Sequence, residues 1–197
     1  PFQTESSYEK TLEEIISLSP NRLAVFSYAH VPWIKPAQKI LERDNLPSPE
    51  TKLNLLKLII EKLTTEGYVY IGMDHFAKPE DSLSRALEDG TLQRNFQGYS
   101  TQRGVDIQGV GPSAISATPY HYAQNHKQLA DWRSDLRSAT LPVMRGYLTT
   151  EEDRLRREII MEIMCKRVVD LDAIASSYEL ESVHDAFPRA LRELEQH

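Results

Sequence analysis

The stretch from Ile71 to Ser116 constrains this chain most, because core packing alone rarely demands its mixture of residues. An apolar run is followed by the cluster Asp74-His75-Phe76, then by the string Asn95-Phe96-Gln97-Gly98-Tyr99, and finally by Gly109-Val110-Gly111. Polar, aromatic and glycine residues gathered at strand ends are typical of a site built from loops. The stretch therefore predicts a site for a flat polar ligand or cofactor.

Composition narrows the class of protein. The chain has 197 residues, a formal net charge of −6 and 40% hydrophobic residues. This length allows one sizeable core or about one and a half domains. The negative charge argues against nucleic acid as the main partner, and no apolar run approaches the roughly 20 residues that span a bilayer. The single cysteine, Cys165, excludes an internal disulfide and fits a reducing cytoplasm, so we expect a cytoplasmic protein in which Cys165 is a buried structural thiol.

Strand and helix patterns alternate in the first part of the chain. The pattern predicts helices from a capping box at Ser6-Ser7-Tyr8-Glu9 to Leu18, from Ser48-Pro49 to Gly67, over 79–89 and over 124–138. Strands are expected at 23–29, at 68–71 and ending at Ala114-Ile115. This alternation predicts an α/β architecture with parallel strands.

The pattern changes after Leu141-Pro142. Thr150 and Asp170 are expected to cap two helices, the second over 171–178, and a last helix is expected over 185–195. We therefore expect residues 1–140 to form an α/β part and residues 141–197 the start of an all-helical domain.

Four strings, in their order and spacing, resemble the oxygen-independent coproporphyrinogen III oxidases, a family of radical S-adenosylmethionine (SAM) enzymes of haem synthesis. They are Ser27-Tyr28-Ala29-His30-Val31-Pro32, Leu46-Pro47-Ser48-Pro49, the Ile71–Ser116 stretch and Tyr122-Ala123-Gln124-Asn125. The resemblance implies that residues 1–140 form the C-terminal half of a partial (β/α) barrel. Residues 141–197 would then begin an incomplete helical C-terminal domain.

The resemblance also implies an activity for the complete enzyme. Such an oxidoreductase uses SAM and a [4Fe-4S] cluster to convert two propionates of coproporphyrinogen III into vinyl groups, giving protoporphyrinogen IX and passing an electron to an acceptor that the sequence does not identify. In this family the cluster is held by a CxxxCxxC motif, and Cys165 alone cannot replace three thiolates. We therefore interpret the chain as a fragment that is inactive by itself.

Three residues are implied as SAM contacts by the resemblance. Ala29, expected at a strand end, would let the ligand approach the backbone, Ile115 would form an apolar wall, and the amide of Gln97 would hydrogen-bond the ligand. Each also has an ordinary structural interpretation, as a small strand-end residue, a core residue and a loop amide.

Cations are expected at the mouth of the substrate site, because the porphyrinogen carries propionates. Arg94 and Arg103 are the expected cations, and His30, Asp74 and His75 are further candidates at this mouth. Asp74 and His75 could transfer a proton, although neighbours on a strand point to opposite faces and need not touch.

The remaining charged residues and histidines do not indicate a further functional site. The run Arg154, Arg156 and Arg157 is expected on a solvated helix face, and the histidines lack metal-ligand spacing.

Two alternatives remain open from the sequence. The first is a related radical SAM protein that acts as a haem chaperone, whose relatives generally lack the DHF and NFQGY strings. The second is a non-catalytic binding module, since residues 171–178 and 185–195 vaguely resemble a helix-turn-helix pair. The acidic balance argues against DNA as its ligand.

Overall fold

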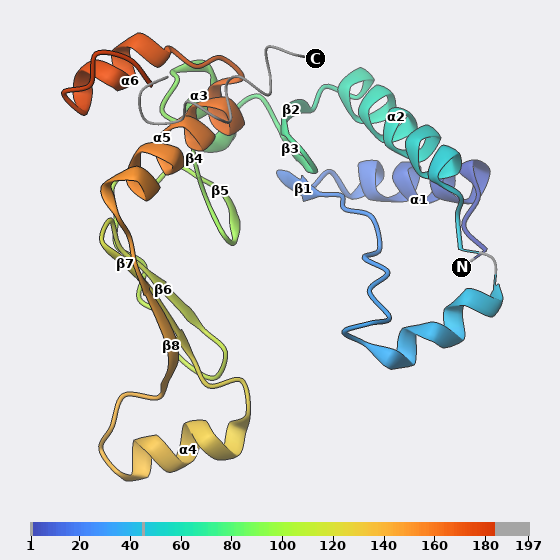
Figure 1. The fold of residues 1–197 in the computed structure, drawn as a ribbon. Helices are drawn as coiled ribbons and strands as arrows, with labels where there is room; N and C mark the ends of the chain where they lie inside the picture. The colour runs from blue at the N-terminus through green and yellow to red at the C-terminus, as the bar shows by residue number, and fades with distance from the viewer. Residues whose placement is uncertain (1, 45, 184–197) are drawn as a thin grey trace. The chain divides into compact units, whose positions relative to one another are not determined.

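Six α-helices, one 3-10 helix and eight strands are formed by residues 2–44 and 46–183, the part of the chain that this computed structural model describes (Figure 1). Contacts within the chain divide it into two units, residues 1–101 and residues 102–197. Each unit is described by itself. No helix among the described residues is both long and apolar enough to cross a membrane.

The first unit contains two long helices that pack against a small sheet. Its elements in chain order are α1 (Glu5–Leu18), β1 (Arg22–Ala24), η1 (Pro36–Asp44), α2 (Pro49–Thr65), β2 (Val69–Gly72), β3 (His75–Ala77), α3 (Ser82–Glu88), β4 (Gln93–Asn95) and β5 (Gly98–Ser100).

The predicted caps are confirmed for α2 in this unit, whereas the helix expected over 79–89 begins only at Ser82, after its N-cap Asp81. The N-cap of α2 is Ser48, and Gly67 follows the helix with φ of +86°, both as expected. The capping box of α1 joins Thr4 to Ser7, so the helix starts slightly earlier than predicted. The 3-10 helix η1 was not predicted.

The strands of the first unit pair differently from our expectation. Their order is β1-β3-β2, and both pairings are antiparallel, so the expected parallel pairing is wrong. The reason is a tight turn at Gly72–Asp74, which sends the chain straight back as β3. β1 and β2 therefore run in the same direction, but β3 lies between them.

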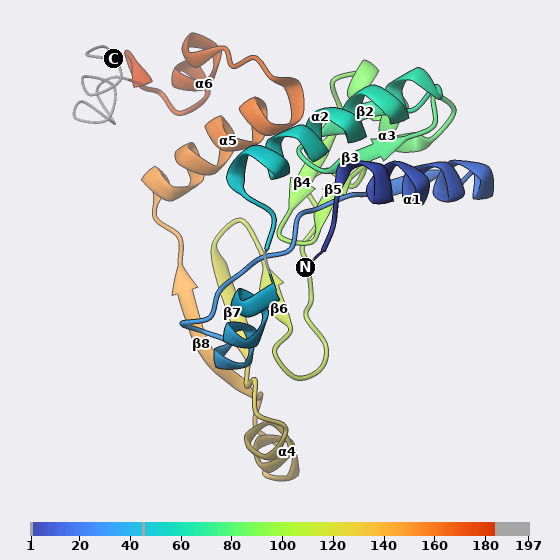
Figure 2. The same cartoon turned by 90° about the vertical axis from the view of Figure 1, so that its right-hand side faces the viewer.

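The core of this unit lies between the sheet and the two helices. α1 and α2 pack side by side, as Figures 1 and 2 show. The buried cluster contributed by both helices and by the sheet comprises Leu12, Ile59, Leu63, Tyr68 and Phe76. Phe76 and Leu12 are each 1% exposed and Leu63 is fully buried, so this small sheet has its own apolar anchor.

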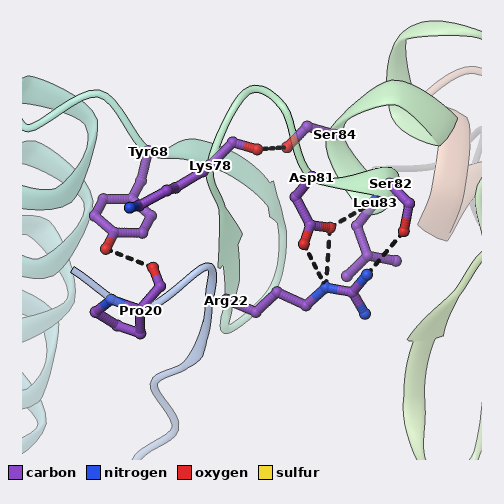
Figure 3. Close-up of polar contacts among 8 residues, drawn as sticks. All are labelled: Pro20, Arg22, Tyr68, Lys78, Asp81, Ser82, Leu83 and Ser84. Atoms are coloured by element: carbon purple, nitrogen blue, oxygen red, sulfur yellow. Dashed lines mark hydrogen bonds and ion pairs between the residues drawn. The ribbon is translucent and has the colours of Figure 1, made fainter. Parts of the chain in front are cut away.

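An ion pair and hydrogen bonds join β1 to the start of α3 (Figure 3). Nε of Arg22 donates to both carboxylate oxygens of Asp81 at 2.9 and 2.8 Å, and its Nη2 donates to Oγ of Ser82 at 2.8 Å. Asp81 also accepts from the backbone N–H of Leu83 at 2.8 Å and so caps α3. Burial alone would raise the pKa of Asp81, but the bonds from Arg22 and Leu83 outweigh it and lower that pKa.

In its described part, the second unit contains a three-stranded sheet and three helices. Its elements are β6 (Ile115–Ala117), β7 (His121–Asn125), α4 (Leu129–Arg137), β8 (Val143–Leu148), α5 (Glu151–Lys166) and α6 (Leu171–Ser177). The sheet order is β6-β7-β8, and both pairings are antiparallel.

Several boundaries in this unit correct the sequence predictions. The helix expected over 124–138 begins only at Leu129, because the residues before it pair as β7 with β6 and β8. The stretch after Pro142 is not entirely helical, since Val143–Leu148 forms β8. The caps Thr150 and Asp170 are confirmed, and Cys165 is buried within α5. The helix expected over 185–195 lies outside the described residues.

Candidate functional site

The turn between β2 and β3 brings together two candidate residues that the sequence did not require to touch. Met73 adopts φ of 51° in this turn, and its carbonyl accepts a hydrogen bond from the hydroxyl of Tyr70 at 2.8 Å. Asp74 lies in the turn rather than on the strand, so its carboxylate can reach Nδ1 of His75 at 2.7 Å. The side chains of Asp74 and His75 are 27% and 21% exposed. The turn therefore creates a half-buried carboxylate–imidazole pair.

The second hairpin, β4–β5, carries the NFQGY string. Oδ1 of Asn95 accepts from the backbone N–H of Gln97 at 2.8 Å, which closes the turn. Arg94 and Tyr99 are cross-strand partners, and the guanidinium of Arg94 stacks over the Tyr99 ring at 5.6 Å. The Nε of Arg94 is buried and has no hydrogen-bond acceptor among the described residues.

The two hairpins interlock through rings placed against glycines. A Cβ built on Gly98, whose φ is +136°, would lie 3.0 Å from Nε2 of His75. A Cβ on Gly72 would collide with the hydroxyl of Tyr99. The rings of His75 and Tyr99 meet edge to face, with centroids 5.2 Å apart. Glycine is thus needed at both positions because each strand receives a ring from the other hairpin.

This cluster, formed by Asp74, His75, Arg94 and Tyr99, combines a proton-transfer group with a cation. The carboxylate of Asp74 accepts from Nδ1 of His75, which fixes the orientation of the ring and places Nε2 beside Gly98. Arg94 has no carboxylate partner among the described residues, so its guanidinium can receive an anionic ligand group. Tyr99 was missed by the sequence analysis, and only its place beside Gly98 in the motif hinted at it.

Ala29 lies away from any strand end in the described structure. The strand expected over 23–29 ends at Ala24, and the chain continues without regular structure to Ala29. Instead, the side chain of Gln38 in η1 holds this segment. Its Nε2 donates to the carbonyl of Ala29 at 3.2 Å, and its Oε1 accepts from the N–H of Val31 at 2.7 Å. Ala29 is exposed and therefore accessible.

His30 is held by the same 3-10 helix. Its Nε2 lies 3.0 Å from Oε1 of Glu42, and its ring lies 6.0 Å from that of Tyr28. Its Nδ1 is buried and unpartnered among the described residues. Gln38 and Glu42 were not found from the sequence, because η1 shows neither a strong cap nor a long apolar stripe.

The remaining predicted residues are placed as follows. Gln97 is exposed in the β4–β5 turn, and its side-chain amide has no partner among the described residues. Ile115 and Arg103 both belong to the second unit, where Ile115 is half-buried and Arg103 is exposed in a loop. A Cβ on Gly109 would lie 2.7 Å from the backbone of Ile115, so this glycine serves close packing there.

The arginine run of α5 is only partly a solvated face. Arg156 is exposed and pairs with Glu152. Arg154 and Arg157 are half-buried and stack over Tyr120 and Tyr122 at 5.7 and 4.8 Å. The prediction of a solvated face is thus wrong for these two arginines, because the tyrosines at the β6–β7 turn and on β7 offer them an aromatic surface.

An iron–sulfur cluster does not fit the residues of this chain. Cys165 is its single cysteine and is 3% exposed inside α5. The residues that the structure describes contain no group of three or more histidine, cysteine or acidic side chains able to hold a metal ion.

Comparisons with known proteins point to one family, although no family model matches the chain. The chain is 46% identical, over 98% of its length, to an oxygen-independent coproporphyrinogen III oxidase of Thermostichus vulcanus and spans 61% of that protein. It is 42% identical, over 91% of its length, to the oxygen-independent coproporphyrinogen III oxidase of Escherichia coli K12 and spans 39% of it.

A solved structure extends this similarity to the fold. Coproporphyrinogen III oxidase from Escherichia coli, described as a radical SAM enzyme, matches 98% of this chain with a TM-score of 0.91 at 41% identity. The match covers 44% of that structure and confirms the expected α/β fold class. By sequence and by fold, the chain therefore belongs to the oxygen-independent coproporphyrinogen III oxidase family of radical SAM proteins.

Proposed function

We propose that this chain contributes part of an enzyme that oxidatively decarboxylates two propionates of coproporphyrinogen III to vinyl groups, giving protoporphyrinogen IX. The observation that carries this proposal is the interlocked cluster of Asp74, His75, Arg94 and Tyr99. It joins a proton-transfer pair to a cation that has no carboxylate partner in the described part of the chain. The 41% identity to a radical SAM coproporphyrinogen III oxidase supports it.

Within this function, the residues of the chain bind and position the substrate. Arg94 would hold a propionate carboxylate, with His30 and Arg103 as further candidates at the mouth of the site. His75, oriented by Asp74, would hold or move a proton close to the substrate. The electron acceptor of the reaction is a separate partner, and we propose a cytoplasmic location.

SAM is the proposed cofactor, with Ala29, Gln97 and Ile115 as contacts from this chain. The exposed amide of Gln97 can hydrogen-bond polar groups of the ligand. The small, exposed Ala29 lets the ligand approach the backbone closely. SAM supplies the abstraction of a hydrogen atom when it is bound beside a reduced [4Fe-4S] cluster. The ligands of such a cluster are not among the residues of this chain.

A chimera tests the proposal. The matching region of the Escherichia coli relative is replaced by this chain, and anaerobic conversion of coproporphyrinogen III is followed by chromatography of the oxidised porphyrins. We expect the chimera to form protoporphyrin and His75→Gln to lower its rate at least about tenfold. His126→Gln is the matched control, since His126 pairs with Asp135 at 3.1 Å in the second unit, and its rate should stay within about twofold.

A chimera that folds and shows cluster absorbance but forms no product would contradict the proposal. Stoichiometric binding of haem by that inactive chimera would favour the haem chaperone instead.

A further inference from the structure

A second polar site lies in the first unit, away from the interlocked hairpins. A cavity of about 120 Å³ opens between α1, the segment that precedes Ala29, and the start of α2. Its polar lining comes from five side chains, and its aromatic walls include Phe26. The five are Gln3, Tyr8, Ser27, Tyr28 and Lys52.

These polar groups are available to a ligand. The side chains of Gln3, Tyr8, Ser27, Tyr28 and Lys52 make no hydrogen bond or ion pair with any residue in the described part of the chain. Tyr8 is half-buried and the other four are exposed, and a few polar groups around a partly apolar cavity are typical of a binding site. Burial also raises the pKa of Tyr8, so its hydroxyl keeps its proton and can act as a donor.

The charge and size of the cavity define the ligand. Among the described residues, Lys52 is the one charged residue in the lining and none of the lining residues is acidic, so the site favours an anion. A dry cavity of roughly 150 Å³ holds one benzene molecule, so about 120 Å³ admits a short carboxylated arm but not a tetrapyrrole ring. The exposed rings of Phe26 and Tyr28 provide an apolar surface at the rim, where a flat macrocycle can rest.

We propose that this cavity is a carboxylate subsite that receives one propionate side chain of the porphyrinogen, with Lys52 as its cation and the hydroxyls of Tyr8 and Tyr28 as donors. The inference rests on the proposed function, since that function supplies the propionate. It assigns a specificity role to Lys52 and Tyr8, neither of which stands out in the sequence.

Binding of coproporphyrin III, the air-stable oxidised form of the substrate, tests this subsite directly. The purified chain is titrated with coproporphyrin III and its dissociation constant is measured by porphyrin fluorescence anisotropy. Lys52→Met should raise the constant about tenfold, and Tyr8→Phe a few-fold, because each loses a bond to the carboxylate. Lys57→Met is the matched control, since Lys57 is exposed on the same helix but does not line the cavity, and it should change the constant less than about twofold.

Two further ligands test whether binding at this cavity depends on a carboxylate group. The tetramethyl ester of coproporphyrin III should bind the wild type about as weakly as coproporphyrin III binds Lys52→Met. Millimolar sodium propionate should compete with coproporphyrin III only in the wild type. Absent binding to the wild-type chain, or equal constants for Lys52→Met and Lys57→Met, would overturn the subsite.

The chimera described above keeps this inference distinct from the proposed function. If the chimera forms product and Lys52→Met leaves its KM unchanged, the subsite fails and the proposed function stands. If the chain binds coproporphyrin III through Lys52 but the folded chimera is inactive, the proposed function fails.

Discussion

The two three-stranded sheets of this chain have the same size and the same antiparallel pairing, but they are stabilised differently. The β1-β3-β2 sheet buries Phe76, Ala77 and Ile71 to 1% exposure or less. In contrast, no residue of β6, β7 or β8 is buried, and every residue of β8 is exposed. Pairing alone therefore does not determine how a sheet is anchored, since the first relies on apolar burial and the second on polar and stacking contacts.

The polar contacts of the second sheet are specific. Nε of Arg145 on β8 donates to Oε1 of Gln124 on β7 at 2.9 Å. Arg157 on α5 stacks over Tyr122 and donates from Nη1 to the carbonyl of Thr118 at 3.1 Å. Such contacts individually contribute about 1 kcal/mol, whereas a fully buried aromatic side chain contributes several times more.

Truncation of the core of the first sheet should have the largest effect. Phe76→Ala should lower the free energy of unfolding of the first unit by about 3–5 kcal/mol, because it leaves a cavity among α1, α2 and β3. The matched change in the second sheet, Met144→Ala on β8, should cost less than about 0.5 kcal/mol, since Met144 is 41% exposed. Hydrogen exchange resolved by peptide in each unit measures both, and similar losses would contradict the contrast.

A glycine substitution in each region should have the next largest effect. Gly98→Ala should destabilise the first unit by about 1–3 kcal/mol, because φ of +136° disfavours alanine and the new methyl meets His75. Gly146→Ala on β8 should stay within about 1 kcal/mol of neutral, because its methyl meets only the carbonyl of Tyr122 at 3.3 Å. Urea titrations give both values, and a neutral Gly98→Ala would show that the hairpins are not interlocked in solution.

Loss of an arginine contact should then weaken the second sheet alone. Arg157→Met should cost about 1–2 kcal/mol, seen as faster hydrogen exchange in β6 and β7, because it removes the stacking on Tyr122 and the bond to Thr118. Arg156→Met is the control and should cost less than about 0.5 kcal/mol, since that side chain is exposed. Equal losses of stability for Arg157→Met and Arg156→Met would show that the contacts of Arg157 do not stabilise the sheet.

The pH dependence of folding stability should show the smallest difference between the two units. Asp81 is a half-buried partner of Arg22, and Asp153 is the third residue of α5, bonded by Thr150 and Tyr147 in the capping box. The pKa of each carboxyl is lowered in the folded chain, for Asp153 chiefly by the backbone N–H of Thr150. Both therefore stabilise the fold above the ordinary aspartate pKa of about 3.9, and this stability is lost as the pH falls through the lower folded values.

Two variants separate these contributions. Between pH 6 and 3, Asp81→Asn should lose less stability on acidification than the wild type, and Asp153→Asn should show the same change to a smaller extent. Thermal unfolding across this range, followed by circular dichroism, measures the slopes. A slope for Asp81→Asn equal to that of the wild type would show that its bond to Arg22 contributes nothing to folding.

Local signals in the sequence predicted three helix caps correctly. Ser48, Thr150 and Asp170 cap helices as expected, because a cap depends on a side chain and a backbone N–H only a few residues apart. Strand pairing was predicted poorly, since short strands such as β1 and β3 have no periodicity that reveals their partners.

The site was predicted in part for the same reason. The sequence singled out Asp74, His75 and Arg94 as candidates because they lie within a motif, whereas Tyr8, Lys52 and Gln38 meet their neighbours only through the fold. The expectation that Asp74 and His75 need not touch assumed a strand where the chain makes a turn. A single turn residue thus decided whether two neighbouring side chains form a pair.

The amino-acid sequence by itself determined the family, the helix caps, and the absence of three cysteine ligands from this chain. These properties depend on residue identity and on contacts within a few residues. Only the tertiary structure decided that β3 lies between β1 and β2, that His75 and Tyr99 pack against glycines of opposite hairpins, and that Lys52 faces a cavity. Each of these depends on segments distant in sequence, whose meeting is set by the burial of a shared core rather than by any local preference.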